Sequence, residues 1–270
     1  MKNKQNLHTH STFCDGKNTP EDTVKKAIER GFDSIGFSIH SRVRTSPQPT
    51  PFENFEPFKA EIARLKEQYR GQIDVFCGVE HDFYSLTSPD GYEYSLAAVH
   101  YLDVCGDLRG FDRSCETVLA YINDYFDGNA MRFAKCYYQT LSRVPEIHNF
   151  DIIAHFDILT KNNEISRFID VDCKEYKDMA FEAVHSLRGK IPFFEVNTGA
   201  MARGYRSSPY PQMDIMKELL YCGFGAMISS DCHDNDYLDT SFDIAREALI
   251  EAGFKSRYIL TDNGFCEIEI

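Results

Sequence analysis

The sequence predicts an α/β protein in which parallel strands form a (β/α) barrel. Seven short apolar segments with the character of strands alternate with segments of helical periodicity. A helix that connects two successive strands usually makes those strands parallel. The chain has 270 residues, which is within the length range of a single-domain α/β barrel. We therefore expect one domain over residues 1–270.

Each predicted strand is a short apolar run with polar or metal-binding side chains at its end. The first runs into residues 7–11, and the others cover residues 32–40, 72–80, 95–100, 150–155, 191–197 and 226–231. The side chains at their ends are His8 and His10, His40, Glu80, His100, His155, Glu195 and Asn197, and Asp231 and His233. In a (β/α) barrel the C-terminal ends of the strands surround the active site. We therefore expect these side chains to converge.

Helical periodicity and capping residues define the segments between the strands. Thr19 precedes a proline and two acidic residues and is expected to cap a helix that Gly31 ends. Further helices are expected over residues 56–69, 114–127, 130–143, 174–187, 211–222 and 242–252. Loops are expected over residues 41–54 and 106–110, and short strand pieces over residues 258–270.

The composition restricts the kind of partner that the protein can bind. A formal net charge of −13 argues against nucleic acid and against an anionic membrane surface, but it permits a small cationic substrate. Nine cysteines without a CxxC pair, and no secretory leader, predict reduced thiols in the cytoplasm. No apolar run approaches the length that spans a membrane. The oligomeric state is left open.

Two short histidine motifs predict a metal centre. His8 and His10 are two residues apart, so their side chains share a face if the segment is extended, and Asp231 and His233 repeat this spacing. Imidazole and carboxylate without thiolate suit Zn, Fe, Mn, Co or Ni better than Ca or Mg. The candidate ligands are His8, His10, Asp15, His40, Glu80, His100, His155, Asp231 and His233. Because a catalytic ion commonly takes about three protein ligands, nine candidates predict two or three ions.

Such a centre is suited to the hydrolysis of a phosphate ester. Two ions about 3.5–4 Å apart can hold a hydroxide and stabilise the entering and leaving oxygens at phosphorus. The carboxylate of Glu80 has two oxygens and could bridge such a pair. We expect Glu80 and Asp231 to act directly in catalysis through the ions, and His233 is one candidate proton donor for the leaving group.

Residues near the predicted ligands are candidates for supporting roles. Asn197 begins a glycine-containing loop that carries Arg203 and Arg206, and a forked guanidinium matches phosphate oxygens. We therefore assign these three residues to phosphate binding. His81 directly follows Glu80 and should face away from the centre, where it could support the ligands from behind, as could Glu195.

Four other residues suggest metal binding only by their type. His148 and His185 are expected to be structural or exposed, because the first precedes a strand and the second lies inside a helix. Cys14 and Cys232 are neighbours of predicted ligands but are expected to be small packed side chains.

The motifs together resemble the polymerase-and-histidinol-phosphatase superfamily of metal hydrolases, and within it the monofunctional histidinol-phosphatases of histidine biosynthesis. They span residues 8–233 and read His8-Thr9-His10-Ser11 with Asp15-Gly16, Phe37-Ser38-Ile39-His40, Gly78-Val79-Glu80, Ala98-Val99-His100-Tyr101-Leu102, Ala154-His155-Phe156-Asp157, Glu195-Val196-Asn197-Thr198 and Ser230-Asp231-Cys232-His233. The chain departs from the family pattern at Ser38, where relatives more often have Thr, and over residues 104–107, where they often have an aromatic-Gly-Phe-Asp sequence. The second departure puts the substrate contacts of that loop in doubt.

The resemblance implies a distorted seven-stranded (β/α) barrel with three divalent transition metal ions, Zn, Fe or Mn. It implies that L-histidinol phosphate is hydrolysed to L-histidinol and phosphate by a hydroxide held between two of the ions. The implied ligands are His8, His10, Glu80 and Asp231 for one ion, Glu80, His100 and His155 for the second, and Asp15, His40 and His233 for the third.

Two alternatives remain open. One is a related phosphoesterase that acts on another phosphomonoester, on phosphotyrosine or on a nucleotide. The other is a metal-bearing regulatory module without activity, which the presence of all nine candidate ligands disfavours.

Overall fold

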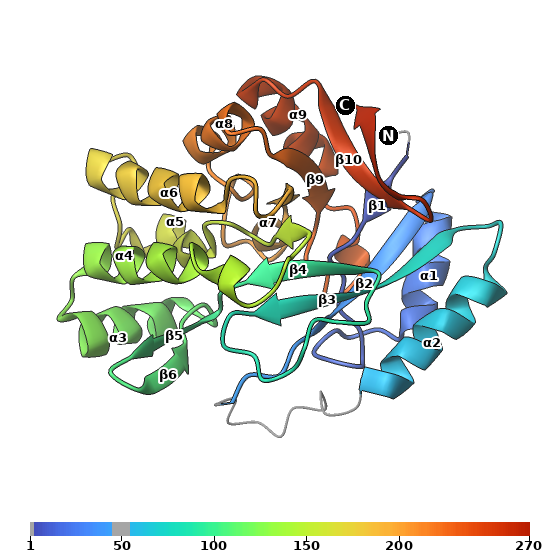
Figure 1. The fold of residues 1–270 in the computed structure, drawn as a ribbon, viewed down its shortest axis with the longest axis horizontal. Coiled ribbons are helices and arrows are strands. Elements are labelled where there is room, and N and C mark those ends of the chain that lie inside the picture. The colour runs from blue at the N-terminus through green and yellow to red at the C-terminus, as the bar shows by residue number, and fades with distance from the viewer. Residues whose placement is uncertain (1–2, 45–54) are drawn as a thin grey trace.

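Seven parallel strands form a nearly closed barrel in the computed structural model, which describes residues 3–44 and 55–270 (Figure 1). Its strands are β1 (Gln5–Asn6), β2 (Ser34–His40), β3 (Asp74–Asp82), β4 (Tyr94–Ala98), β7 (Ile152–Ile153), β8 (Phe193–Asn197) and β9 (Gly225–Ser229). The order in the sheet is β1-β2-β3-β4-β7-β8-β9, and each neighbouring pair is parallel. The predicted barrel of seven strands is therefore confirmed.

The two ends of the sheet meet beyond β1 and β9. Thr9 forms a parallel bridge with Cys232. The backbone N–H of His10 donates to the carbonyl of Cys232 at 2.8 Å, and the N–H of Cys232 donates to the carbonyl of His8 at 3.0 Å. Because this bridge joins the two histidine motifs, barrel closure places the first and last predicted ligands side by side.

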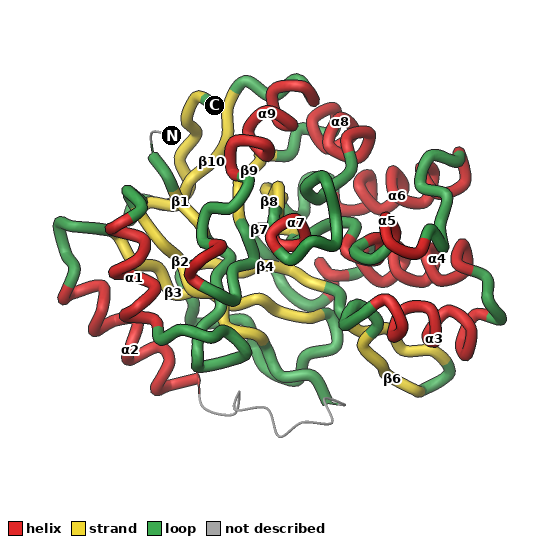
Figure 2. Tube along the Cα trace, turned by 180° about the vertical axis from the view of Figure 1, so that it is seen from behind, coloured by secondary structure: helices red, strands yellow, loops and turns green. Residues whose placement is uncertain are grey.

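Helices surround the strands on the outside of the barrel. They are α1 (Pro20–Glu29), α2 (Phe55–Gln68), α3 (Cys115–Phe126), α4 (Ala130–Leu141), α5 (Asn163–Ser166), α6 (Lys174–Leu187), α7 (Gly199–Ala202), α8 (Met213–Tyr221) and α9 (Phe242–Ala252). Figure 2 shows α1 and α2 on one side of the strands and α3 to α6 on the other. As predicted, Thr19 caps α1, because its hydroxyl accepts from the backbone N–H of Asp22. None of the described helices is long and apolar enough to cross a membrane.

Some segments differ from the sequence-based expectation. The loop expected over residues 106–110 is part of a hairpin of β5 (Tyr101–Val104) and β6 (Asp107–Gly110), which turns at Cys105 and Gly106, both with positive φ. The strand expected over residues 150–155 is shortened to β7. Part of the predicted glycine-containing loop is α7. Of the loop expected over residues 41–54, residues 45–54 lie outside the described part of the chain.

A cluster of buried apolar side chains from the strands fills the inside of the barrel, and Tyr94 is its largest member together with Phe76. Tyr94 on β4 is fully buried, and a Cβ added to Gly36 or Gly78 would lie within 3 Å of its ring and hydroxyl atoms. The Tyr94 hydroxyl donates to the backbone carbonyl of Leu7 at 2.5 Å. The glycines on β2 and β3 therefore make room for a tyrosine that holds the chain just before His8.

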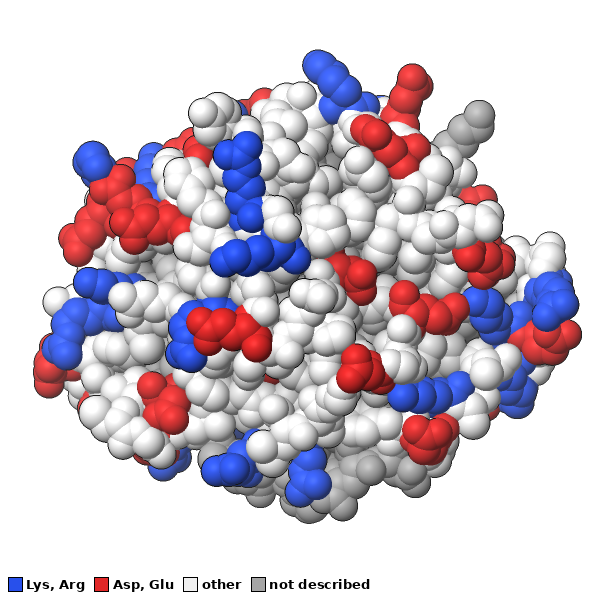
Figure 3. All heavy atoms as spheres, in the orientation of Figure 1, with Lys and Arg blue, Asp and Glu red and all other residues white. Residues whose placement is uncertain are grey.

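A C-terminal hairpin packs at the other end of the barrel. β10 (Ser256–Thr261) and β11 (Gly264–Glu269) are antiparallel, as the strand pieces expected in this region suggested. Gln5, the first residue of β1, exchanges hydrogen bonds of 2.8 Å with the backbone of Leu260. The hairpin thus covers the N-terminal ends of the strands and leaves the C-terminal ends open. Acidic and basic side chains are mixed over the face drawn in Figure 3.

Candidate metal centre

All nine predicted ligands lie around the C-terminal ends of the barrel strands. His8, His10 and Asp15 follow β1, His40 ends β2, Glu80 lies in β3, His100 follows β4, His155 follows β7, and Asp231 and His233 follow β9. Side-chain contacts connect the nine in one network. The structure therefore brings together from six separate segments what the sequence predicted as one site.

Glu80 lies at the centre of this network, and its two carboxylate oxygens face different histidines. Oε1 is 3.2 Å from His100 Nε2 and 2.8 Å from His155 Nε2. Oε2 is 3.3 Å from His8 Nε2, 3.4 Å from His10 Nε2 and 2.8 Å from His40 Nδ1. Imidazoles thus surround both oxygens of one buried carboxylate, and this combination of donors suits a divalent transition metal.

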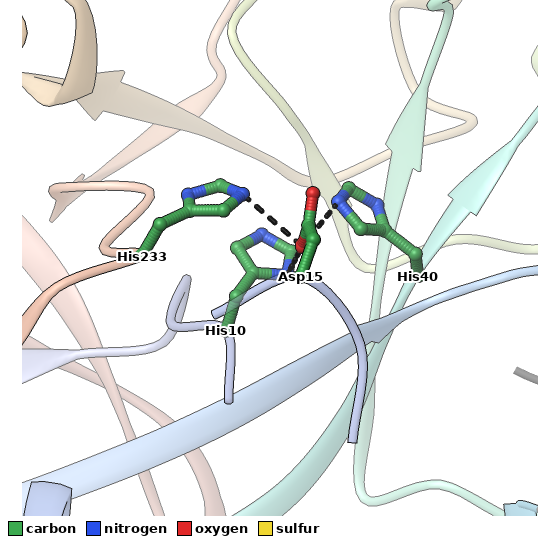
Figure 4. A group of neighbouring side chains, drawn as sticks. All are labelled: His10, Asp15, His40 and His233. Carbon is green, nitrogen blue, oxygen red and sulfur yellow. Dashed lines mark ion pairs between the residues drawn. The ribbon is translucent and has the colours of Figure 1, made fainter. Parts of the chain in front are cut away.

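Asp15 is the centre of a second group (Figure 4), and this group is nearer to the solvent because the side chain of Asp15 is 53% exposed. His40 and His233 approach it from opposite sides, and the Nε2 atom of each lies 3.3 Å from Oδ1. His10 Nδ1 lies 3.9 Å from the same oxygen, and its ring stacks on those of His40 and His233 with centroid distances of 4.2 Å. This group shares His10 and His40 with the surroundings of Glu80.

Asp231 connects the histidines after β1 with an arginine. Its Oδ1 lies 3.3 Å from His10 Nε2 and 3.6 Å from His8 Nε2. Its Oδ2 accepts a hydrogen bond of 2.9 Å from Arg203, which also donates to the Asp231 carbonyl. Asp231 and His155 both have positive φ, of 46° and 21°, which is costly for residues other than glycine. Such strain is typical of positions where function fixes the direction of a side chain.

Among the buried polar atoms of the centre that have no hydrogen-bond partner, three lie together. The Nε2 atoms of His8 and His10 lie 3.3 Å and 3.4 Å, respectively, from Oε2 of Glu80, without hydrogen-bond geometry. An unpaired polar atom in a protein interior is costly, and buried polar groups are almost always satisfied. The imidazole and carboxylate donors suit a divalent transition metal, which would satisfy all three atoms. The residues present therefore fit such a metal.

Glu195 on β8 contacts His8 on the side of the imidazole that faces away from Glu80. Its carboxylate lies 2.9 Å from His8 Nδ1, and it accepts hydrogen bonds from the backbone N–H of His155 at 2.7 Å, from Asn197 at 2.7 Å and from Ser229 at 2.5 Å. Because a carboxylate accepts the Nδ1 proton of His8, the Nε2 lone pair of His8 points into the centre. Glu195 thus has the supporting position that the sequence suggested for it.

Charges within the cluster determine the protonation of its members. Burial alone would raise the pKa of Glu80, but the neighbouring imidazoles of His8, His40 and His100 hold it well below its usual range. Burial alone would lower the pKa of His100, but Glu80 and Asp82 raise it to about 10. Burial and then the charges of neighbouring histidines lower the pKa of His10 to about 3, so this imidazole is neutral, as metal binding requires.

The centre lies at the bottom of a cavity of about 1040 Å³. Among the predicted ligands, Asp15, His40, Glu80, His100, Asp231 and His233 line the cavity. His8, His10 and His155 lie beneath them, with exposed fractions of 0–3%. The cavity walls also carry Asp82, Asp107, Asp112, Lys161, Arg203 and Tyr205. A ligand in this cavity would therefore meet the metal centre and groups of both charges.

The three residues predicted to bind phosphate have different positions. Arg203 lines the cavity, as expected. The guanidinium of Arg206 is buried, donates to Thr160 and to the Ser208 carbonyl, and lies 4.4 Å from the centroid of the Tyr210 ring.

Asn197 is also buried, and its amide donates to Glu195 and accepts from the Gly199 N–H. The positions of Arg206 and Asn197 therefore give no support to a phosphate contact, because their polar atoms are engaged inside the protein.

His81 faces away from Glu80, as strand alternation predicted, and its Nε2 donates to the Thr87 carbonyl at 2.7 Å. Cys14 and Cys232 are buried among core residues, as expected. His185 is on the surface of α6, which also agrees with its prediction.

The sequence-based interpretation missed Asp82. This residue lines the cavity and accepts a hydrogen bond of 2.7 Å from the backbone N–H of His100. It is two residues after Glu80 on the same strand, so the alternation that grouped the histidines also points to it. Asp112 and Lys161 were missed as well; they lie 3.3 Å apart at the cavity wall, and no local pattern identifies them.

Comparison with known proteins gives one family. The model of the PHP domain matches residues 6–199. The probable histidinol-phosphatase of Schizosaccharomyces pombe is 23% identical over 278 residues, which cover 92% of this chain and 87% of that protein. The corresponding protein of Deinococcus radiodurans is 22% identical over 258 residues, with 91% and 92% covered.

A solved structure has the same fold. The histidinol phosphate phosphatase of Lactococcus lactis, solved with zinc, L-histidinol and phosphate, superposes with a TM-score of 0.73 at 19% identity, and the match covers 98% of this chain and 99% of that one.

Proposed function

This chain belongs to the PHP domain family, and from that premise we propose that it is a metal-dependent histidinol-phosphatase, which hydrolyses L-histidinol phosphate to L-histidinol and phosphate. The position of Glu80 carries the proposal, because one buried carboxylate contacts five imidazoles at the bottom of a cavity large enough for a small substrate. The names of the relatives, which the chain matches over most of its length, support the choice of substrate.

We infer three ions per chain, of Zn, Fe or Mn. His8, His10, Glu80 and Asp231 would hold the first, Glu80, His100 and His155 the second, and Asp15, His40 and His233 the third. The separate groups of imidazoles at the two oxygens of Glu80 support this division, as does the separate group at Asp15. When bound, the ions would supply Lewis acidity toward the phosphoryl oxygens and lower the pKa of water.

The side chains around the ions would orient the substrate. Arg203 lies at the cavity wall with its guanidinium held by Asp231, so it is placed to bind phosphoryl oxygens beside the centre. His233 donates its Nδ1 proton to the Asp231 carbonyl, which leaves Nε2 facing Asp15. Both residues are thus fixed before the substrate arrives, and this lowers the entropic cost of the reaction.

The remaining cavity wall suits the other end of histidinol phosphate. Asp82, Asp107 and Asp112 line the cavity in addition to the predicted ligands. L-histidinol carries an ammonium group and an imidazole, both of which carboxylates can bind. A substrate with a phosphate at one end and a cation at the other would therefore find Arg203 for its phosphate and Asp82 for its cation. Asp107 and Asp112 are paired with Arg109 and Lys161 at the same wall.

A steady-state comparison tests this function. The purified protein is assayed with L-histidinol phosphate, a nucleoside monophosphate, phosphotyrosine and a simple alkyl phosphate, before and after treatment with a chelator. We expect kcat/KM for histidinol phosphate to exceed the others at least about 100-fold, because recognition of both ends adds about 2.7 kcal/mol of transition-state binding. Equal rates on all esters would contradict the substrate, and full activity after chelation would contradict the mechanism.

We also propose that the protein works in a reducing compartment such as the cytoplasm. All nine cysteines are free thiols in the structure, including the exposed Cys105 and Cys266. Exposed thiols of this kind persist where thiols are kept reduced.

A further inference from the structure

A second group of metal-binding side chains lies on the outer helices, apart from the centre described above. His185 is on α6, Glu218 is on α8, and Cys222 directly follows α8. Within residues 3–44 and 55–270, this is the one group of three such side chains that shares no member with the barrel centre. Its ligand atoms all lie within 4.8 Å of one another.

The packing of two helices produces this arrangement. α6 and α8 lie side by side on the outside of the barrel (Figure 1). Glu218 and Cys222 are four residues apart, so one face of α8 presents both. His185 lies in the last turn of α6 and faces α8, where its Nε2 is 2.6 Å from Oε1 of Glu218. The Sγ atom of Cys222 is 3.9 Å from the same oxygen. Three different donor groups therefore converge on one point between two helices.

We propose that His185, Glu218 and Cys222 form a peripheral binding site for a divalent transition metal, with zinc as the best match. Nitrogen, oxygen and sulfur donors together favour zinc or cobalt over calcium or magnesium, which require oxygen ligands. Three protein ligands leave one tetrahedral position for water. His185 is 56% exposed at its side chain and Glu218 is 20% exposed, so an ion can enter from solvent.

The local charges mostly favour a cation at this point. The last carbonyls of α8 carry partial negative charge, and Cys222 lies at that end of the helix. Glu218 adds a full negative charge, and Arg188 is the cation that opposes it. Burial and then Glu218 raise the pKa of the Cys222 thiol, so the thiol is protonated without metal. Binding would form a sulfur–metal bond and release the thiol proton to solvent.

An ion at this site would connect two helices that otherwise meet through packing, the His185–Glu218 contact and an ion pair of 2.7 Å between Lys177 and Asp214. Because the three ligands come together only in the folded chain, binding would stabilise the native state by mass action. The site is independent of the proposed phosphatase function, since none of its residues lines the catalytic cavity.

Cobalt binding tests the site, because a thiolate bound to Co²⁺ gives a near-ultraviolet charge-transfer band. The full chain is stripped with a chelator and reloaded with Co²⁺, and the bound metal is counted by mass spectrometry. The nine ligands of the barrel centre contain no sulfur, so the band reports Cys222. The test variants are Cys222→Ser and His185→Gln, of which the second changes an exposed side chain and should not disturb folding. Cys266→Ser, at an exposed cysteine elsewhere, is the matched control.

We expect the wild type and Cys266→Ser to show the band and one more equivalent of metal than Cys222→Ser. His185→Gln should raise the dissociation constant for this equivalent at least about tenfold. An unchanged band and an unchanged metal stoichiometry in both test variants would overturn the proposal. Loss of the band in a further variant, Cys14→Ser, would also overturn it, because the metal-bound thiolate would then lie beside His10. Phosphatase activity should be the same in wild type and Cys222→Ser, so failure of this site and failure of the proposed function are distinguishable.

Discussion

Single side chains behind the metal centre determine how well it can hold an ion. Glu195 makes no contact with the cavity, yet it accepts hydrogen bonds from four donors and fixes the orientation of His8. We expect Glu195→Gln to weaken metal binding by about 10–100-fold, because an amide cannot accept from all four donors. Metal retained after dialysis against a series of chelator concentrations measures this change.

Glu146→Gln is the control for that experiment, since the same chemical change is made at an exposed ion pair with Arg143. Equal metal retention in Glu195→Gln and Glu146→Gln would show that Glu195 does not tune the centre.

The two arginines after β8 should respond differently to substitution. Arg203→Ala is expected to lower kcat/KM at least about tenfold, a loss of about 1.4 kcal/mol, because the guanidinium lines the cavity. Arg206→Ala is expected to lower the free energy of unfolding by about 1–3 kcal/mol, because it removes buried hydrogen bonds to Thr160 and to the backbone. Steady-state kinetics and denaturant unfolding of both variants check this separation, and a larger kinetic loss in Arg206→Ala would reverse our assignment.

Arg203 lines the cavity and Arg206 is buried, and the sequence alone does not distinguish these two positions. The histidines and carboxylates could be predicted because each lies at the end of an apolar strand, and barrel geometry fixes where those ends go. The burial of Arg206 depends on Thr160, 46 residues earlier, and on stacking against Tyr210. No local sequence pattern indicates a contact between residues so far apart in the chain. Asp82, in contrast, could have been predicted, because it lies two residues after Glu80 on the same strand and strand alternation places both side chains on one face.

At the scale of elements, β2, β3 and β4 position the first ligands through one tyrosine. Gly78 leaves room for the Tyr94 ring, since an added Cβ would lie 2.2 Å from its Cζ atom. We expect Gly78→Ala to lower the free energy of unfolding by about 1–3 kcal/mol, because the buried ring must shift. Metal affinity should fall with it, as the Tyr94 hydroxyl holds the Leu7 carbonyl next to His8. Denaturant unfolding and metal titration measure the two effects.

Gly110→Ala provides the comparison for that variant. An added Cβ there comes no closer than 3.4 Å to another atom, so the same substitution meets ordinary contacts. If both alanine variants were equally stable, the barrel interior would not depend on the close contact between Gly78 and Tyr94.

The elements themselves were largely predictable, since capping residues and periodicity indicated most helices to within a few residues. The exceptions lie near the cavity. The β5–β6 hairpin contributes Tyr101 and residues 107–110 to the cavity wall, and β7 ends just before His155, whose backbone has positive φ.

For the whole molecule, the metal centre should contribute to stability as well as to activity. Its ligands come from six segments, so ions bound there stabilise the folded chain over the unfolded one. At free metal about 100 times the dissociation constant, the gain is about 2.7 kcal/mol. For a chain of this size that corresponds to about 5–10 °C in Tm.

Calorimetry of stripped and reloaded protein in the Cys222→Ser background measures this gain without the proposed peripheral site. Reloading should restore both Tm and phosphatase activity. Loss of activity without any change in Tm would mean that the ions are bound too weakly to support the barrel.

The bridge between Thr9 and Cys232 also has a consequence for synthesis. The ribosome makes His8 and His10 more than 200 residues before Asp231 and His233, to which the bridge joins them. Any product of interrupted translation that stops before Asp231 carries at most seven of the nine predicted ligands. The metal site is therefore completed in a single step, when the segment after β9 pairs with the segment after β1.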